Sequence, residues 1–155
     1  MKLSIIIPAY NTGELLKKAV GSVIGQPFQD WELIIVDDGS KDNTPSVCKQ
    51  LSEKDKRIQI IRTENQGAYK ARLTGAENAR GEWVMFMDSH DSITPEFITG
   101  LMKHENSGAD IIAGTLNLNN KAVFKHKVSG FLTSSEYICA LIDYRTSIGP
   151  YAKLF

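Results

Sequence analysis

Apolar runs and amphipathic segments alternate along the chain from residue 3 to about residue 105. Runs rich in Ile, Val, Leu and Trp, bounded by turn-forming or polar residues, predict three buried strands. A further run that alternates polar and apolar residues predicts a more exposed strand. In chain order, the four predicted strands are Leu3–Ile7, Trp31–Val36, Arg57–Arg62 and Trp83–Met87.

Apolar side chains at helical spacing occupy the intervals between these runs. Asn11 with Glu14 has the form of a capping box, and Thr44 and Thr94 each stand as a capping residue before a first-turn proline. The predicted helices begin at Asn11, Thr44, Ala68 and Glu96 and extend to about residues 24, 53, 79 and 105. The apolar face expected for the first helix consists of Leu15, Leu16, Ala19, Val20, Val23 and Ile24.

Small residues mark the predicted helix over 68–79. Ala71, Gly75, Ala76 and Ala79 would allow the backbone of this helix to approach a neighbouring element closely. Because a mid-helix Gly costs about 1 kcal/mol relative to Ala, we expect Gly75 to have a packing role.

Strands that alternate with helices predict an α/β fold, a Rossmann-like open twisted sheet that is mostly parallel and has helices on both faces. The sequence contains no internal repeat, low-complexity tract or linker, so we expect one domain over residues 1–155. The pattern weakens after residue 105. It predicts a strand at 110–113, a loop at 117–120, a hairpin arm at 122–128, a helix at 133–143 and a tail at 149–155 without an evident partner.

Composition excludes several classes of protein. Eighteen Lys and Arg balance eighteen Asp and Glu, so no excess of positive charge is available for nucleic acid. Cys48 and Cys139 are too far apart for a metal motif and are expected to be free thiols in a reducing compartment. No apolar run reaches the roughly 18 residues of a membrane span, and the first residues resemble a strand rather than a signal peptide. We expect a cytoplasmic protein.

Lysine clusters leave one further location open. Lys17, Lys18 and the lysines between residues 121 and 127 are interpreted as solvated faces. Peripheral attraction to anionic lipid at the inner face of the cell membrane is the alternative.

Three loops follow the carboxyl ends of predicted strands, where open α/β sheets bind ligands. They are Pro8–Asn11, Asp37–Ser40 and Asp88–Asp91. The acidic pair of the second loop is also compatible with an ordinary Asp-Gly turn. Two acidic loops at one sheet edge would repel each other, however, unless a cation or hydrogen-bond donors lay between them.

The third loop, Asp88-Ser89-His90-Asp91, carries a candidate cation site. If the strand continued through it, the period of two would place Asp88 and His90 on one side and Ser89 on the other. A carboxylate and an imidazole on one side can bind a divalent cation; the alternative is an acidic turn. The sequence lacks the glycine-rich motifs of dinucleotide and P-loop sites, so a bound diphosphate would need such a cation.

Four motifs in order carry a resemblance to a known family. They are SIIIPAYN at 4–11, VDDGSKDNT at 36–44, NQGAYKAR at 65–72 and ARGEWVMFMDSHD at 79–91. Together they resemble the N-terminal, nucleotide-sugar-binding part of the inverting glycosyltransferase family 2, which has the GT-A fold. The resemblance covers residues 3 to 95 strongly and the rest weakly.

The resemblance implies a role for each loop. Pro8, Ala9 and Tyr10 would line the base and ribose of a UDP-type donor, and Asp38 would hydrogen-bond the nucleobase with Asp37 beside it. Gly67 and Arg72 would border the nucleotide pocket. The implied substrate-binding residues are Pro8, Ala9, Tyr10, Asn11, Asp37, Asp38, Gly39, Gly67, Arg72, Asp88 and Ser89.

The resemblance also implies a metal site, with one departure. Asp88 and His90 occupy the positions of the family's D-x-D signature, which holds Mn²⁺ or Mg²⁺ on the donor diphosphate. The second acid of that signature is His90 here. We expect Asp88, His90 and Asp91 to be the metal ligands; whether His90 binds the ion or Asp91 replaces it stays open.

The implied reaction is attack by an acceptor hydroxyl on the anomeric carbon of the sugar, with inversion, in the synthesis of a cell-surface polysaccharide or glycan. The acceptor would be a glycan or a lipid-linked sugar, and a carboxylate would serve as general base. No acid here occupies a matching position, so we expect the base beyond Phe155 and a chain truncated on its acceptor side. The alternative is a donor-binding module without transferase activity of its own.

Overall fold

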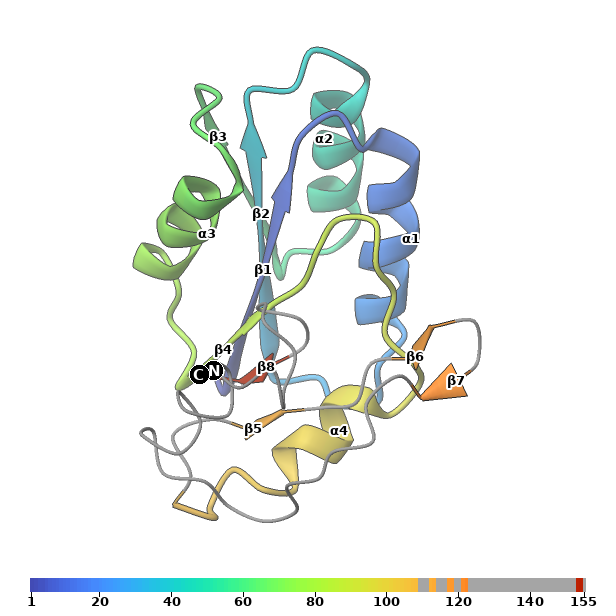
Figure 1. Ribbon diagram of the computed structural model, residues 1–155, viewed down its shortest axis with the longest axis vertical. Coiled ribbons are helices and arrows are strands. Elements are labelled where there is room, and N and C mark those ends of the chain that lie inside the picture. Colours follow the sequence, from blue (N-terminus) through green and yellow to red (C-terminus); the bar gives the residue numbers. More distant parts are fainter. Residues whose placement is uncertain (109–111, 114–116, 119–120, 123–152, 155) are drawn as a thin grey trace.

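The computed structural model describes residues 1–108, 112–113, 117–118, 121–122 and 153–154, and it shows an α/β fold (Figure 1). The central sheet has the strand order β3-β2-β1-β4-β8-β5. The first four strands of the chain are mutually parallel neighbours, and β8 is antiparallel to both β4 and β5. The strands are β1 (Leu3–Ala9), β2 (Trp31–Asp38), β3 (Ile58–Thr63), β4 (Trp83–Phe86), β5 (Ile112–Ala113) and β8 (Lys153–Leu154).

Helices cover both faces of this sheet, as the alternation of strands and helices predicts (Figure 1). On one face lie α1 (Gly13–Ile24) and α2 (Thr44–Lys54), and on the other lies α3 (Ala68–Glu77). Because side chains alternate along β1, Ile5 and Ile7 pack in the cluster with α1 and α2, while Ile6 packs in the cluster with α3. The short helix α4 (Phe97–Met102) adds its buried side chains to the first cluster.

The predicted capping roles of Asn11 and Thr94 are wrong, although α4 begins within one residue of its predicted start at Glu96. Helix α1 begins at Gly13, and Asn11 has a φ of 52° in the preceding loop, where it binds another loop instead of capping the helix. Helix α4 begins after Glu96, which has a φ of 63°. Helix α2 starts near Pro45 as predicted, although Asn43 rather than Thr44 is the capping residue.

The apolar face of α1 is narrower than its spacing suggests. Leu16, Ala19, Val20 and Val23 are buried, whereas the other two predicted positions, Leu15 and Ile24, are 48% and 37% exposed.

The part of the chain after α4 agrees less well with the sequence pattern. A two-stranded antiparallel pair, β6 (Asn117–Leu118) and β7 (Lys121–Ala122), stands where a loop was expected. The tail expected to lack a partner contributes β8 to the central sheet. The predicted helix at 133–143, most of the hairpin arm at 122–128 and Cys139 lie outside the described residues. No helix among the described residues combines the length and apolar character needed to cross a bilayer.

A buried ionic network closes the end of the sheet opposite the acidic loops. Glu32 is fully buried on β2 and accepts hydrogen bonds from Ser4 Oγ (2.7 Å), Gln59 Nε2 (3.0 Å) and Arg80. The Arg80 guanidinium donates from Nε (3.0 Å) and Nη2 (2.6 Å) to the same carboxylate oxygen. Burial raises the pKa of Glu32, but the bonds from Arg80 and Ser4 outweigh it, so the net shift is downward.

The lowered pKa predicts the pH dependence of stability. Because the folded chain favours ionised Glu32, its contribution is complete above the ordinary Glu pKa of about 4.3 and is lost as pH falls through the lowered folded value. Glu32→Gln should cost about 2 kcal/mol at neutral pH, and the difference from wild type should shrink on acidification. Urea unfolding from pH 3 to 8 measures it. The exposed Glu53→Gln is the control; a Glu32→Gln cost independent of pH would contradict the assignment.

Helix α3 lies unusually close to β1. Its sheet-facing side consists of the small residues Ala71 and Gly75, both buried. A Cβ added at Gly75 would collide with the side chain of Ile6 on β1. The packing role predicted for Gly75 is therefore confirmed: the glycine permits this close approach.

This close contact can be tested with two mid-helix glycines. Gly75→Ala should destabilise the chain by about 1–3 kcal/mol because the added methyl group overpacks the interface with Ile6. Gly21→Ala in α1 is the matched control, since a Cβ there meets nothing within 4 Å. The control should gain up to about 1 kcal/mol from helix propensity. Unfolding midpoints in urea compare the two; equal shifts would show that α3 is not tightly packed.

Candidate functional site

Two loops at the carboxyl end of the sheet are joined by hydrogen bonds. The Asn11 backbone N–H donates to Ser40 Oγ (3.0 Å), and the Lys41 N–H donates to Asn11 Oδ1 (2.8 Å). The Thr12 N–H donates to Thr44 Oγ1 (2.9 Å). The loops after β1 and β2 therefore hold each other in place and form one continuous rim.

The first of these loops offers one accessible aromatic side chain. Pro8 and Ala9 are buried as the last residues of β1, while Tyr10 is 45% exposed. Of the three residues predicted to line a base and ribose, Tyr10 is therefore the one whose ring can meet a ligand from solvent.

Asp37 and Asp38 are both buried, and they serve different partners. They are consecutive in β2, so their side chains point to opposite faces of the sheet. Asp37 accepts a hydrogen bond from the Ser40 N–H (2.9 Å), and its other oxygen lies 3.6 Å from Arg62 Nε. Asp37 thus stabilises the turn that contains Gly39, which has a φ of 73°.

Asp38 fixes the start of α3. It accepts the backbone N–H groups of Gln66 (2.9 Å) and Gly67 (2.8 Å) and the hydroxyl of Thr63 (3.2 Å). Gly67 precedes α3 with a φ of 89°, a conformation that L side chains rarely adopt. The hydrogen bond from Asp38 to a nucleobase stays a prediction, since protein donors already bind both carboxylate oxygens.

One turn further along α3, Arg72 binds the second acidic loop. Its Nη2 donates to Asp88 Oδ1 at 2.5 Å, and both side chains are largely buried. Helix α3 therefore connects the two acidic loops: the backbone amides just before its first residue bind Asp38, and Arg72 binds Asp88.

The second acidic loop is a turn rather than a continued strand. Strand β4 ends at Phe86, and the Asp91 N–H donates to the Asp88 carbonyl (3.1 Å). The period-two prediction is therefore wrong past Phe86, because the backbone is no longer extended. In this turn Ser89 is buried and His90 is exposed, whereas Asp88 is intermediate between them.

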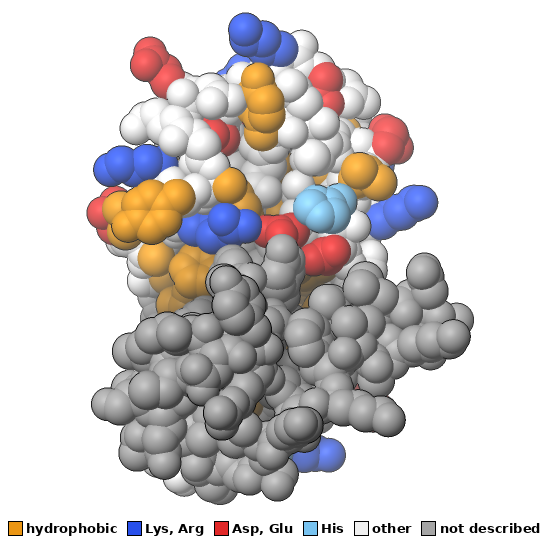
Figure 2. Space-filling model, in the orientation of Figure 1, with side chains coloured by type: hydrophobic (Ala, Val, Ile, Leu, Met, Phe, Trp, Pro, Cys, Tyr) orange, Lys and Arg blue, Asp and Glu red, His pale blue; other side chains and the backbone are white. Residues whose placement is uncertain are grey.

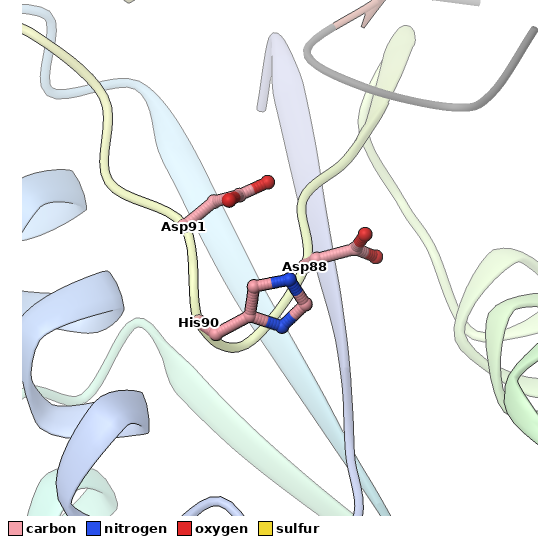
Figure 3. A group of neighbouring side chains, drawn as sticks. All are labelled: Asp88, His90 and Asp91. Atoms are coloured by element: carbon pink, nitrogen blue, oxygen red, sulfur yellow. The ribbon is translucent and has the colours of Figure 1, made fainter. Parts of the chain in front are cut away.

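The turn brings the three predicted metal ligands together. Asp88, His90 and Asp91 each offer one ligand atom, and these atoms all lie within 4.8 Å of one another. The three side chains project to the same side of the loop (Figure 3). On this face a histidine side chain lies beside acidic side chains, with a basic side chain beyond them (Figure 2).

The chemistry of this cluster fits a divalent cation. Burial, with a smaller contribution from Asp88, raises the pKa of Asp91, while His90 acts in the opposite direction. A cation would relieve the cost of a partly buried carboxylate beside another acid. Two ligands of one ion lie at most about 4.2 Å apart when its bonds are about 2.1 Å, so small side-chain rotations would complete the site.

Two polar residues that the sequence did not single out anchor the segment after this turn. Ser22 Oγ accepts the Ile93 N–H (3.1 Å), and the buried Gln26 bonds the Thr94 carbonyl (2.8 Å) and the Ile98 N–H (3.1 Å). Gln26 lies three residues after the buried Val23, at the spacing of the buried positions of α1. This spacing is the signal by which the sequence could have predicted that Gln26 is buried.

Cys48 does not contribute a nucleophile. Its thiol is free, and the residue is buried. Burial, and next the charge of Asp37, raises the pKa of Cys48 to about 12. The thiol is therefore protonated and inert at neutral pH.

Solved structures share this fold. Staphylococcus aureus TarS 1-349 in complex with UDP-GlcNAc superimposes on the whole chain with a TM-score of 0.82 and 24% identity, and the match covers 45% of TarS 1-349. The mannosyltransferase PcManGT from Pyrobaculum calidifontis, in complex with GDP-Man and Mn²⁺, matches 75% of the chain and 36% of its own length, with a TM-score of 0.69 and 21% identity. These two likenesses establish the fold, which is of the GT-A type.

Sequence relatives extend the likeness. The Campylobacter jejuni GalNAc(5)-diNAcBac-PP-undecaprenol beta-1,3-glucosyltransferase is 34% identical over 131 residues, which cover 83% of this chain and 42% of the relative. The chain spans only 15% to 42% of the length of the first three curated relatives. A model of the family described as glycosyl transferase family 2 matches residues 4–146, and the chain therefore belongs to that family.

Proposed function

We propose that this chain binds a nucleotide-diphosphate sugar, a UDP-sugar, through a divalent cation and transfers the sugar with inversion to a hydroxyl acceptor. The observation that carries the proposal is the cluster of Asp88, His90 and Asp91 at the carboxyl end of β4. The cluster follows β4, and the rim is formed by the loops that follow β1 and β2. These three strands are parallel neighbours in one sheet, and α/β sheets bind ligands at the carboxyl ends of such strands. A structural neighbour with a bound UDP-sugar supports the donor class.

The base and ribose would bind at the rim. Tyr10 supplies an exposed ring for stacking, and Pro8, Ala9 and Asn11 shape the first loop. Asp37, Asp38 and Gly39 shape the second, with Asp38 placing Gly67 at the border of the pocket. In this proposal the buried carboxylates act mainly by fixing backbone that faces the nucleotide.

The diphosphate would bind at the acidic turn. Asp88, His90 and Asp91 would hold Mn²⁺ or Mg²⁺, and Ser89 would face inward beside them. The bound ion would act as a Lewis acid that offsets the negative charge on the leaving nucleotide. Arg72 keeps Asp88 in position through their ion pair.

The acceptor side of the proposal follows from the family to which the chain belongs. The acceptor would be a glycan or lipid-linked sugar, as in cell-surface polysaccharide synthesis, at the cytoplasmic face of the membrane. No general base is assigned among the described residues. The competing proposal is a donor-binding module without transferase activity of its own. It is favoured because both acids of the turn, Asp88 and Asp91, are assigned to the cation, so neither is left to act as general base.

Calorimetric titration of the chain with UDP and UDP-GlcNAc, with and without Mn²⁺, tests donor binding. Binding should require Mn²⁺, and His90→Ala should lower the metal-dependent affinity by at least about tenfold. The control is His104→Ala, since His104 is also exposed and lies outside the cluster. Equal affinities for wild type and His90→Ala would remove His90 from the site.

Turnover separates the two candidate functions. If the chain transfers the sugar itself, UDP release should depend on added acceptor, whereas a donor-binding module should bind the UDP-sugar without robust release. Release of UDP from UDP-sugars, with saccharide acceptors present, measures this. Sustained release that depends on acceptor would establish the transferase and refute the module.

A further inference from the structure

We propose that Ser22 and Gln26 are positioning residues for donor binding, because they hold the chain that leaves the acidic turn of residues 88–91 against α1. The inference rests on the proposed function, since it concerns the geometry at which the donor would be received. Neither side chain belongs to the candidate site, and both act through the segment 93–98.

The acidic turn is fixed at both of its ends. Where the chain enters the turn, the Met87 N–H donates to the Ile6 carbonyl on β1 (3.0 Å). Where the chain leaves, the Ile93 N–H donates to Ser22 Oγ on α1 (3.1 Å). The segment 88–92 between these two bonds contains the entire turn. Because a short segment with both ends fixed has few conformations left, the bond at the exit restricts the turn as well as the bond at the entry.

Gln26 extends this attachment to the start of α4. Its Nε2 donates to the carbonyls of Ser22 (3.1 Å) and Thr94 (2.8 Å), and its Oε1 accepts the Ile98 N–H (3.1 Å). The Ile98 N–H lies in the first turn of α4, where a helix provides no acceptor of its own. Gln26 is only 2% exposed, so water has no access to replace these bonds when the amide is removed.

A strained residue lies between the two groups of the segment that Gln26 binds. Glu96 has a φ of 63°, in the left-handed region that is costly for a residue with a side chain. Such a conformation persists only where the surrounding structure fixes it. Gln26 fixes the chain on both sides of Glu96, through Thr94 and Ile98. Without the amide the chain at Glu96 would relax, and the change would reach the turn, because Thr94 follows Asp91 by three residues.

This attachment is separate from the packing that keeps α4 in the core. Ile98, Leu101 and Met102 are buried in the cluster that also contains the buried side chains of α1. These apolar contacts remain when the amide is replaced by an apolar side chain of similar length. We therefore expect loss of the amide to release the exit of the turn while the core stays folded.

Gln26→Met tests the role, because it keeps an unbranched side chain of similar length and removes the three hydrogen bonds. Hydrogen exchange of the free chain should become faster in peptides that cover residues 87–98, with peptides of β2 unchanged. The affinity for UDP in the presence of Mn²⁺, measured by calorimetry, should fall by at least about tenfold. The control is Ile58→Val, which truncates a buried side chain on β3, a strand that β2 and β1 separate from β4. The control should bind UDP like wild type.

A pair of milder variants tests the bond to Ser22. Ser22→Ala removes the acceptor of the Ile93 N–H and should lower the affinity for UDP by about threefold to tenfold. Ser22→Thr retains a hydroxyl oxygen and should restore the affinity. If the two anchors served stability alone, the affinity would follow the thermal unfolding midpoint across all of the variants, Ile58→Val included.

The outcomes separate this inference from the proposed function. A wild-type chain that binds no UDP with Mn²⁺ would overturn both. Wild-type binding that Gln26→Met weakens no more than Ile58→Val does would overturn the positioning role and leave the proposed function in place. Faster exchange confined to α4, with the peptides over 87–93 unchanged, would also overturn it. If thermal unfolding shows that Gln26→Met does not fold, the Ser22 pair decides.

Discussion

The close packing of α3 on β1 is the constraint on which the site depends. Ala71 and Gly75 let the helix approach Ile6, and a bulkier pair would push the helix outward. The same helix begins at amides bound by Asp38 and carries the guanidinium that binds Asp88. An outward shift would therefore loosen both acidic loops together. In this way a packing contact inside the molecule sets the geometry at its edge.

Charge is managed differently at the two ends of the sheet. At one end, Glu32 is buried but accepts hydrogen bonds from Ser4, Gln59 and Arg80, so its charge is compensated. At the other, Asp91 is partly buried beside Asp88, and its pKa is raised. A buried charge without a partner costs free energy. The turn that carries Asp91 is a candidate binding site because its charge is not compensated within the protein, whereas the charges of a structural ion pair compensate each other.

Periodicity within each segment predicted the elements of this fold well. The four parallel strands, the three long helices and the packing role of Gly75 follow from local spacing, because each depends on which face of an element is buried. Two of the predictions that failed involve partners distant in the sequence. Asn11 bonds Lys41 rather than capping α1, and the tail pairs as β8 with strands far before it. Local patterns carry no information about such contacts.

The candidate site shows the same division. The residue types and spacing of Asp88, His90 and Asp91 predicted them as metal ligands. A turn brings them together, however, and not the continued strand that the sequence analysis considered. The anchor Ser22 lies on α1 and the anchor Gln26 just beyond its end, in a segment from which the sequence predicted only an apolar face. Side chains that hold a loop from outside its own sequence need the tertiary structure to be found.

The hydrogen bonds that join the loops after β1 and β2 affect how a ligand would be received. Because the backbone around Asn11 and Ser40 is already fixed, little conformational entropy remains to be lost there when a ligand arrives. Such a surface discriminates between ligands by the shape that it has before binding, and not by closing around the ligand. If one of these two loops were exchanged between related proteins, the ligand selectivity would be transferred only if the other loop were exchanged as well.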